Sequence, residues 1–417
     1  MQKKLIALAV AGLSTAAFAQ TNVTIYGVAD VSAQGYNMTQ SNGANAKPAG
    51  GSFNMTNNSS LLGFKGTEDL GNGLKGLFQV ETNVNLTGGA AGVQANTGNS
   101  AFGSLRDTYV GLNSKYGTVM AGYLSTPFRS ALNSFDVMPG ATGVGRIENM
   151  MGTTRFGNAF SNGAPSTGTG YVQGASSVRA TALAYAIPTL YGINGSIAYT
   201  GSNNNGGSNQ VTITEGSNTA TNLVPQSALS MNLGWSGYGV DIKGAFQQAK
   251  INNTTGVSYS TTAGGTTTTA ASNNSYQAYT SYLIGAAYTG VPGLKAAVVY
   301  NRNTLGLNAN GADSVAAKGS NNQIWAGVSY RFGNNEPRLS YVNSSNTSGF
   351  DNSQDGGRQI TANWGYYLSK RTQVYGLVSQ VKNNANGVWN FGGTGSNLAP
   401  TGGQSLLTYG AGMRTNF

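Results

Sequence analysis

Apolar and polar residues alternate in short segments along most of this chain. In residues 407–414, for example, the odd-numbered positions are apolar, whereas the even-numbered positions are small or polar. A period of two predicts β-strands that have one apolar and one polar face. Sixteen such segments are found, at residues 22–36, 60–69, 74–86, 105–113, 117–124, 178–187, 192–202, 228–235, 240–251, 279–289, 294–303, 322–332, 337–346, 358–368, 372–381 and 406–417.

The connections between these segments alternate between tight turns and long loops. Seven are tight, such as Gly71-Asn72-Gly73, and eight are long, the longest at about residues 125–177. Antiparallel strands joined in this way place all the turns at one end of the sheet and all the loops at the other. An even number of strands with this asymmetry is typical of outer-membrane barrels. We therefore predict an all-β fold, a 16-stranded antiparallel transmembrane β-barrel. A soluble β-sandwich would also alternate, but it would not show the asymmetry of the loops.

The N-terminus has the pattern of an export signal. Lys3 and Lys4 precede an apolar stretch at residues 5–18, and Ala17-Phe18-Ala19 has the small residues of a signal-peptidase site. The alternative, a buried amphipathic helix, is disfavoured because the stretch is apolar on every side. We predict a signal peptide at residues 1–19 and a barrel at residues 20–417.

Composition excludes several classes of function. Only 9% of the 417 residues are charged, and the chain has no His and no Cys. Catalytic triads, Cys-His pairs and most zinc sites are thereby excluded, so we expect no enzyme, no metal and no cofactor. The formal net charge of +10 becomes about +8 once Lys3 and Lys4 are removed. Because the chain is exported, nucleic acid is not an expected partner.

Three basic residues fall on the apolar parity of their strands. Lys250, Arg302 and Arg358 each lie at a strand end beside a long loop. A cation facing lipid at mid-bilayer costs roughly 2–4 kcal/mol, but at a strand end it would meet headgroups instead. One interpretation is that these residues contact lipopolysaccharide phosphates in the outer-membrane lipid. The alternative is that the strand boundaries are displaced by one residue.

Several segments show a resemblance to a known family. Residues 23–30 (VTIYGVAD), 62–75 (LGFKGTEDLGNGLK) and 109–119, together with the terminal Phe417, resemble the Gram-negative general porins, particularly those of beta-proteobacteria. The resemblance implies a homotrimer in the outer membrane of a Gram-negative bacterium that passes small ions and hydrophilic solutes through a water-filled pore. It further implies a third long loop folded into each barrel and a role for Phe417 in barrel assembly.

The resemblance also implies a pore constriction. Members of the family set selectivity by basic residues on the wall that face acidic or polar groups on the third loop. Arg106 and Arg179 match two such arginines, whereas Leu61 stands where a third is common and Lys65 is the nearest substitute. Asp136 or Glu148 would face them from the loop. We expect weak to moderate anion selectivity.

Two other functions remain open. A substrate-specific outer-membrane channel would share all of these features. A secreted or surface adhesin could share the richness in Gly, Asn and Thr, but it should show a fixed repeat of roughly 20–30 residues, which we do not find.

Overall fold

The computed structural model describes most of the chain after residue 21. The described residues are 22–39, 45–46, 53–87, 102–151, 179–201, 211–215, 218–253, 257–263, 266–272, 276–307, 318–348, 354–391, 400 and 402–417. The expected signal peptide and residues 152–177 of the expected third long loop lie outside these ranges.

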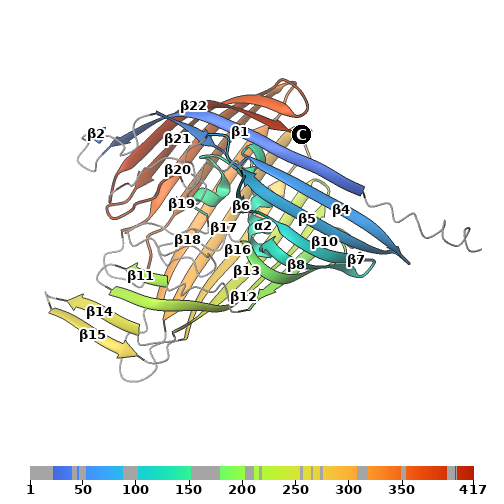
Figure 1. The fold of residues 1–417 in the computed structure, drawn as a ribbon. Helices are drawn as coiled ribbons and strands as arrows, with labels where there is room; N and C mark the ends of the chain where they lie inside the picture. Colours follow the sequence, from blue (N-terminus) through green and yellow to red (C-terminus); the bar gives the residue numbers. More distant parts are fainter. Residues whose placement is uncertain are drawn as a thin grey trace, which may run out of the picture.

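Sixteen strands of the described chain follow one another around a ring (Figure 1). They are β1 (Asn22–Thr39), β4 (Leu61–Gly71), β5 (Leu74–Val84), β7 (Thr108–Ser114), β8 (Gly117–Ser125), β9 (Arg179–Ala186), β10 (Ile193–Thr200), β12 (Asn218–Gly237), β13 (Val240–Asn253), β16 (Tyr276–Tyr288), β17 (Leu294–Leu307), β18 (Lys318–Tyr330), β19 (Asn335–Ser344), β20 (Gly357–Tyr367), β21 (Thr372–Asn383) and β22 (Ser405–Asn416).

The ring closes through the first and last of these strands. One edge of β1 pairs with β22, from Val28 opposite Asn416 to Thr39 opposite Ser405. The other edge pairs with β4, where Asn22 lies opposite Thr67. Each of these sixteen strands therefore pairs with a neighbour on both sides, as a strand in hydrocarbon requires. The predicted 16-stranded antiparallel barrel is confirmed.

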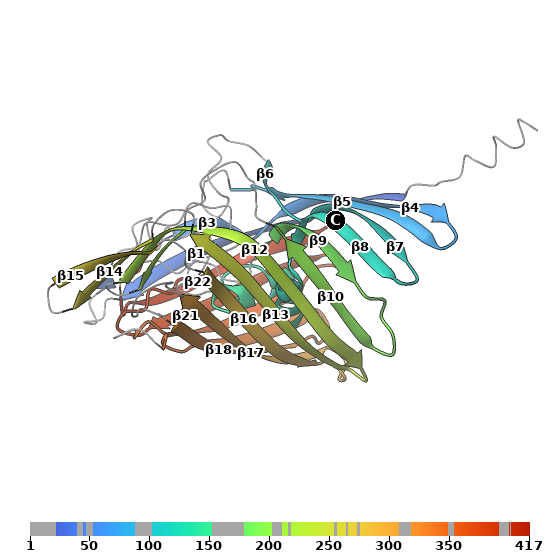
Figure 2. The same cartoon turned by 90° about the horizontal axis from the view of Figure 1, so that it is seen from below.

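Six shorter strands extend the barrel at its loop end or flank it. They are β2 (Asn45–Ala46), β3 (Phe53–Asn57), β6 (Phe102–Leu105), β11 (Val211–Glu215), β14 (Val257–Ala263) and β15 (Thr266–Ser272). Strand β12 also begins at Asn218, ahead of the expected 228. The sequence pattern missed these parts because apolar alternation ends where the lipid ends, whereas Thr-rich backbone continues to favour strand pairing. The β14–β15 hairpin extends from the end opposite the tight turns (Figure 2).

Side chains alternate between the outer and inner surfaces of the sheet. In β20, Ile360 and Trp364 are exposed on the outside, whereas Gln359 and Thr361 are buried on the inside. The same holds in β18, where Ile324 is exposed and Gln323 is buried. The expected apolar outside and polar inside are therefore observed, which is the reverse of a soluble protein.

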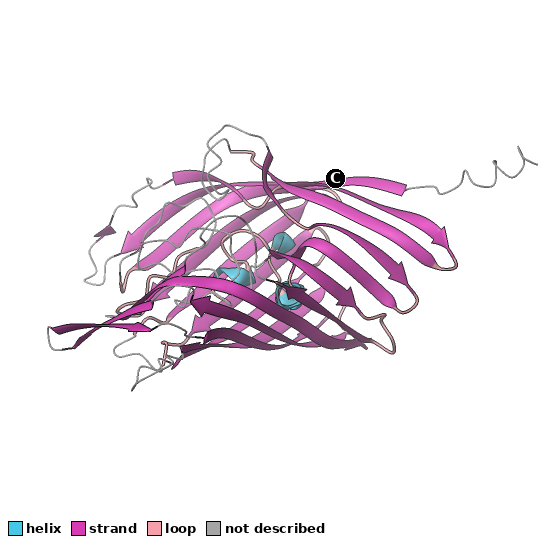
Figure 3. Cartoon of the chain, turned by 60° about the horizontal axis from the view of Figure 1, so that its bottom comes forward, coloured by secondary structure: helices cyan, strands magenta, loops and turns pink. Residues whose placement is uncertain are grey.

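In the described part of the connection after β8, one short helix is followed by two 3-10 turns. Helix α2 (Pro127–Phe135) begins where the Thr126 side chain accepts a hydrogen bond from the Arg129 N–H at 3.3 Å, and Pro127 is suited to its first turn. The turns η1 (Pro139–Ala141) and η2 (Ile147–Asn149) continue the segment. Among the described residues, none of these helices has the length and apolarity needed to cross a membrane. Figure 3 draws them surrounded by strands.

Candidate functional site

Residues 126–151 are hydrogen-bonded to two separate parts of the barrel wall. On β12, Ser230 Oγ accepts a hydrogen bond from Phe128 N at 3.0 Å, and Asn232 donates to the Pro127 carbonyl at 2.7 Å. On the other side, Gln323 of β18 donates to the Met150 carbonyl at 2.8 Å, and Gln359 of β20 to the Val144 carbonyl at 2.5 Å. The described part of the expected third loop is thus bound to inward-facing side chains on both sides.

Two lysines on the inner wall bind the C-terminal end of α2. Lys295 Nζ donates to the carbonyl oxygens of Ser134 and Asp136, at 2.9 Å and 2.7 Å. Lys243 Nζ donates to Ser134 Oγ at 2.9 Å and to Asp241 Oδ2 at 2.7 Å. Carbonyls in the last turn of a helix lack partners within the helix and carry partial negative charge, so ammonium groups stabilise them.

The Asp136 side chain forms hydrogen bonds within residues 126–151. Its two carboxylate oxygens accept hydrogen bonds from the backbone N–H groups of Met138 and Ile147, both at 2.8 Å. Burial raises the pKa of this carboxyl to about 6, because the charged form loses its hydration. The contacts of its carboxylate are with the backbone of its own segment.

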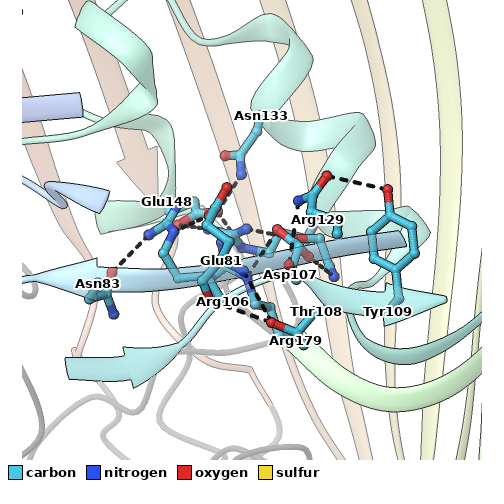
Figure 4. A network of polar contacts seen from close by, with 12 residues as sticks. Glu81, Asn83, Arg106, Asp107, Thr108, Tyr109, Arg129, Asn133, Glu148 and Arg179 are labelled. Carbon is cyan, nitrogen blue, oxygen red and sulfur yellow. Dashed lines mark hydrogen bonds and ion pairs between the residues drawn. The ribbon is translucent and has the colours of Figure 1, made fainter. Parts of the chain in front are cut away.

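A cluster of charged residues lies where β5, the start of β7 and β9 meet residues 126–151 (Figure 4). On the wall, the Arg106 guanidinium pairs with Glu81, and it donates to Asn83 Oδ1 at 3.1 Å. Glu81 also accepts a hydrogen bond from the Tyr26 hydroxyl at 3.0 Å. Arg106 is therefore held by two acceptors on the neighbouring strand.

A second wall pair lies beside the first. Arg179 Nε is 3.2 Å from Asp107 Oδ2, and the same oxygen accepts from Ser125 Oγ at 3.1 Å. Ser125 Oγ in turn accepts from Arg129 of α2 at 2.9 Å. This chain of hydrogen bonds joins the wall to the segment that follows β8.

Within residues 126–151, Glu148 is the acidic partner of two arginines. Its carboxylate is 2.9 Å from Arg129 Nε and 3.9 Å from Arg146, and it accepts a hydrogen bond from Asn133 at 2.6 Å. Burial by itself would raise its pKa, but the guanidinium groups of Arg129 and Arg146 outweigh burial and hold the pKa of Glu148 below its ordinary value.

The structure brings together three of the five residues expected at the constriction. Arg106, Arg179 and Glu148 lie in the cluster. Lys65 is on the inward parity but exposed, with its ammonium group 5.2 Å from the centre of the Tyr26 ring. Asp136 belongs instead to the part of the segment that Lys295 contacts.

Sequence reasoning missed four charged members of the cluster, namely Glu81, Asp107, Arg129 and Arg146. A signal for one of them was present in the sequence. Glu81 shares its parity with Gln79 on a strand whose inward face is polar. Arg129 had no such signal, because its position depends on where the helix meets the wall.

Two of the three expected lipid contacts lie on the outer surface of the barrel. Arg302 and Arg358 are exposed on the same parity as the apolar residues Tyr300 and Ile360. For Lys250 the structure gives the register partner, Ser227 of β12. For Arg302 and Arg358, a displacement of the strand boundaries that would turn them inward is therefore excluded.

Phe417 closes the last strand. Its backbone N–H and carbonyl exchange hydrogen bonds with Gly27, each at 3.1 Å, and its ring covers that glycine so closely that a Cβ atom there would lie 2.3 Å from the ring. The terminal residue thus completes the pairing of β22 with β1.

Comparisons with known proteins agree with this architecture. A family model described as "Gram-negative porin" matches residues 5–386. The major outer membrane protein P.IB of Neisseria gonorrhoeae is 26% identical over 380 residues, covering 90% of this chain and 92% of that protein. The solved structure of an anion-selective porin from Comamonas acidovorans aligns with a TM-score of 0.66 at 20% identity, over 95% of this chain and 100% of that one. The trimer form of OmpT from Vibrio cholerae aligns with a TM-score of 0.58 at 12% identity, over 95% and 99%.

Proposed function

This chain belongs to the Gram-negative porin family, and from this premise we propose that it is a general diffusion channel with a weak to moderate preference for anions. Porins are passive channels of the outer membrane and not enzymes. The barrel supplies a hydrated path, a size limit and an electric field. No reaction has to be accelerated, so selectivity is a matter of the charges along the path.

The charge cluster is the observation that carries the proposed selectivity. Four guanidinium groups, those of Arg106, Arg129, Arg146 and Arg179, meet three carboxylates. The cluster therefore retains one positive charge. Lys65, on the same wall, adds a second one nearby.

The size of the effect follows from electrostatics. Two unit charges about 4 Å apart interact by about 1 kcal/mol in bulk water and by more beside low-dielectric protein. One or two excess cations at a narrow point therefore favour anions over cations by several-fold. In this proposal Arg106, Arg179 and Lys65 attract anions from the wall, and Asp136 and Glu148 on the inward-folded loop limit the excess charge.

Three further features complete the proposal. The chain is exported by a signal peptide at residues 1–19 and assembles as a homotrimer, and a trimer form is known for the OmpT protein of Vibrio cholerae, whose fold it shares. Phe417 serves barrel assembly through its pairing with Gly27. Lys250, Arg302 and Arg358 contact lipopolysaccharide in the outer leaflet.

Measuring the zero-current potential in a KCl gradient across a planar bilayer tests the selectivity. We expect a sign that corresponds to anion preference, and we expect Arg106→Glu to shift it toward cations, since the change removes a positive charge and adds a negative one. Lys370→Glu at an exposed tight turn is the matched control. Cation preference of the unaltered protein, or an unchanged potential in Arg106→Glu, would refute the assignment.

A further inference from the structure

Two cations lie directly opposite each other on the outer surface of the barrel. In the register of β20 with β21, Arg358 is the partner of Lys382. Both residues are exposed and share the outward parity of Ile360 and Val378. Directly opposed residues have Cβ atoms about 4.5–5.5 Å apart, and like charges at such a position destabilise the sheet.

Nothing in the described chain neutralises this pair. Neither Arg358 nor Lys382 makes a hydrogen bond or ion pair with a described residue. Asp355, an acid close in sequence, is buried, and its carboxylate accepts hydrogen bonds from the Thr347 backbone N–H at 2.7 Å and from the Thr347 hydroxyl at 2.6 Å. Strands β17 to β21 carry one acid, Glu336, which lies on the inward parity and pairs with Arg338 at 2.5 Å. The repulsion between the two cations therefore remains unless an anion from outside the described residues binds between them.

More basic residues occupy outward positions at the same end of the barrel. Arg302 on β17 is exposed, and its guanidinium is held by Asn322 at 3.0 Å and Ser320 at 3.2 Å on the neighbouring strand. Lys318 occupies an outward register position on β18, opposite Gly306. Three strand spacings separate β17 from β20, so Arg302 lies about 14 Å from the pair and faces a separate site.

The height of the pair on the barrel identifies its surroundings. Eight residues separate Arg358 from Tyr366, an exposed aromatic residue near the tight turns. At a rise of about 3.3 Å per residue and a tilt of about 40°, this corresponds to about 20 Å along the barrel axis. The apolar band of an outer-membrane barrel is about 25 Å tall. If Tyr366 marks the inner edge of this band, the pair lies about 5 Å below its outer edge. From there the long side chains of Arg358 and Lys382 can extend to the headgroups of the outer leaflet.

We propose that Arg358 and Lys382 together bind a phosphate group of a phosphorylated lipid headgroup. A guanidinium binds phosphate oxygens bidentately, and an adjacent ammonium adds a point charge. The bound phosphate would convert a repulsive pair into an attractive one. This inference deepens the lipid contact proposed above, because it names the pair and adds Lys382.

Binding of purified protein in detergent to bisphosphorylated lipid A, followed by native mass spectrometry, tests the site. We expect the double variant Arg358→Gln/Lys382→Gln to bind the lipid at least tenfold more weakly than the parent protein. Lys370→Gln, which removes an exposed cation at the tight-turn end, should bind like the parent. Equal binding by the double variant and the parent would overturn the proposal.

Two further arms identify the ligand's source. Dephosphorylated lipid A should bind the parent about as weakly as the bisphosphorylated lipid binds the double variant. Inorganic phosphate should not compete at concentrations comparable with the lipid. Undiminished binding of the dephosphorylated lipid would exclude phosphate recognition, and competition by inorganic phosphate would assign the site to free anions.

A stability measurement gives a signature that a merely structural role would not produce. Without phosphorylated lipid, Lys382→Gln should unfold at the same temperature as the parent or higher, because it removes the repulsion. With the lipid, it should unfold at a lower temperature than the parent. A lower temperature under both conditions would contradict the proposal. Conductance of these variants should equal that of the parent, so failure of the lipid site is distinguishable from failure of the channel function.

Discussion

The ammonium group of Lys295 on β17 donates a hydrogen bond to the backbone carbonyl of Asp136, 159 positions earlier in the chain, at 2.7 Å. A second bond from the same ammonium reaches the Ser134 carbonyl. One wall residue therefore holds the point at which the helix ends and the segment turns toward the opposite wall.

Replacing this lysine should loosen the segment. In Lys295→Met the two carbonyls lose their donor, and an unsatisfied buried acceptor costs about 1–3 kcal/mol. We expect more frequent transient changes of current in single-channel recordings. Lys295→Arg retains hydrogen-bond donors, so its current should be as steady as that of the parent. Lys370→Met, at an exposed tight turn, controls for the loss of a positive charge. Recordings of Lys295→Met that match the parent would contradict an anchoring role.

Neutralising the central carboxylate should strengthen anion preference. Glu148→Gln leaves Arg129 and Arg146 without their acidic partner and raises the net charge of the cluster by one. The zero-current potential in a KCl gradient should shift toward anions. Glu336→Gln removes the same charge beside a tight turn, where Arg338 is the partner, and should shift the potential less. A larger shift in the control would place the selective charges elsewhere.

Selectivity should depend on pH through Asp136. Because the pKa of this carboxyl is raised to about 6, it is ionised at pH 7.5 and protonated at pH 5. Acidification then removes one negative charge from the segment, so anion preference should increase between these values. Glu148, whose pKa is lowered, stays ionised throughout. Asp136→Asn should abolish the dependence, and a variant that keeps it would assign the titration to another group.

Closure of the barrel should depend on an ion pair between its first and last strands. Asp30 of β1 and Arg414 of β22 are buried and 3.1 Å apart, and Tyr375 donates to the same carboxylate at 2.6 Å. Removing one partner of a buried pair costs about 3–5 kcal/mol.

We therefore expect Asp30→Asn to lower the temperature at which the folded band disappears on a detergent gel. Asp241→Asn, in a more exposed pair with Lys243, should change this temperature little. Equal effects of the two substitutions would show that the ion pair between β1 and β22 stabilises the barrel no more than the exposed pair does.

Much of this architecture was predictable because alternation is a local property. The parity of Ile324 and Gln323, or of Arg302 beside Tyr300, depends only on neighbours in the sequence and on which side of the sheet meets lipid. The length of the pattern was less predictable, since β12 continues beyond the membrane, where apolar residues are no longer required.

The alternation of the chain, the order of tight and long connections and the scarcity of charge by themselves determined a closed sheet with an oily exterior and a polar interior. The resemblance to the porin family directed attention to Arg106, Arg179 and Glu148. Only the tertiary structure decided that Glu81, Asp107 and Arg129 are their partners, that Asp136 acts within its own segment, and that Arg358 faces Lys382. The physical reason is that strand parity repeats every two residues, whereas ion pairs form between residues brought together by register and by the path of a long loop.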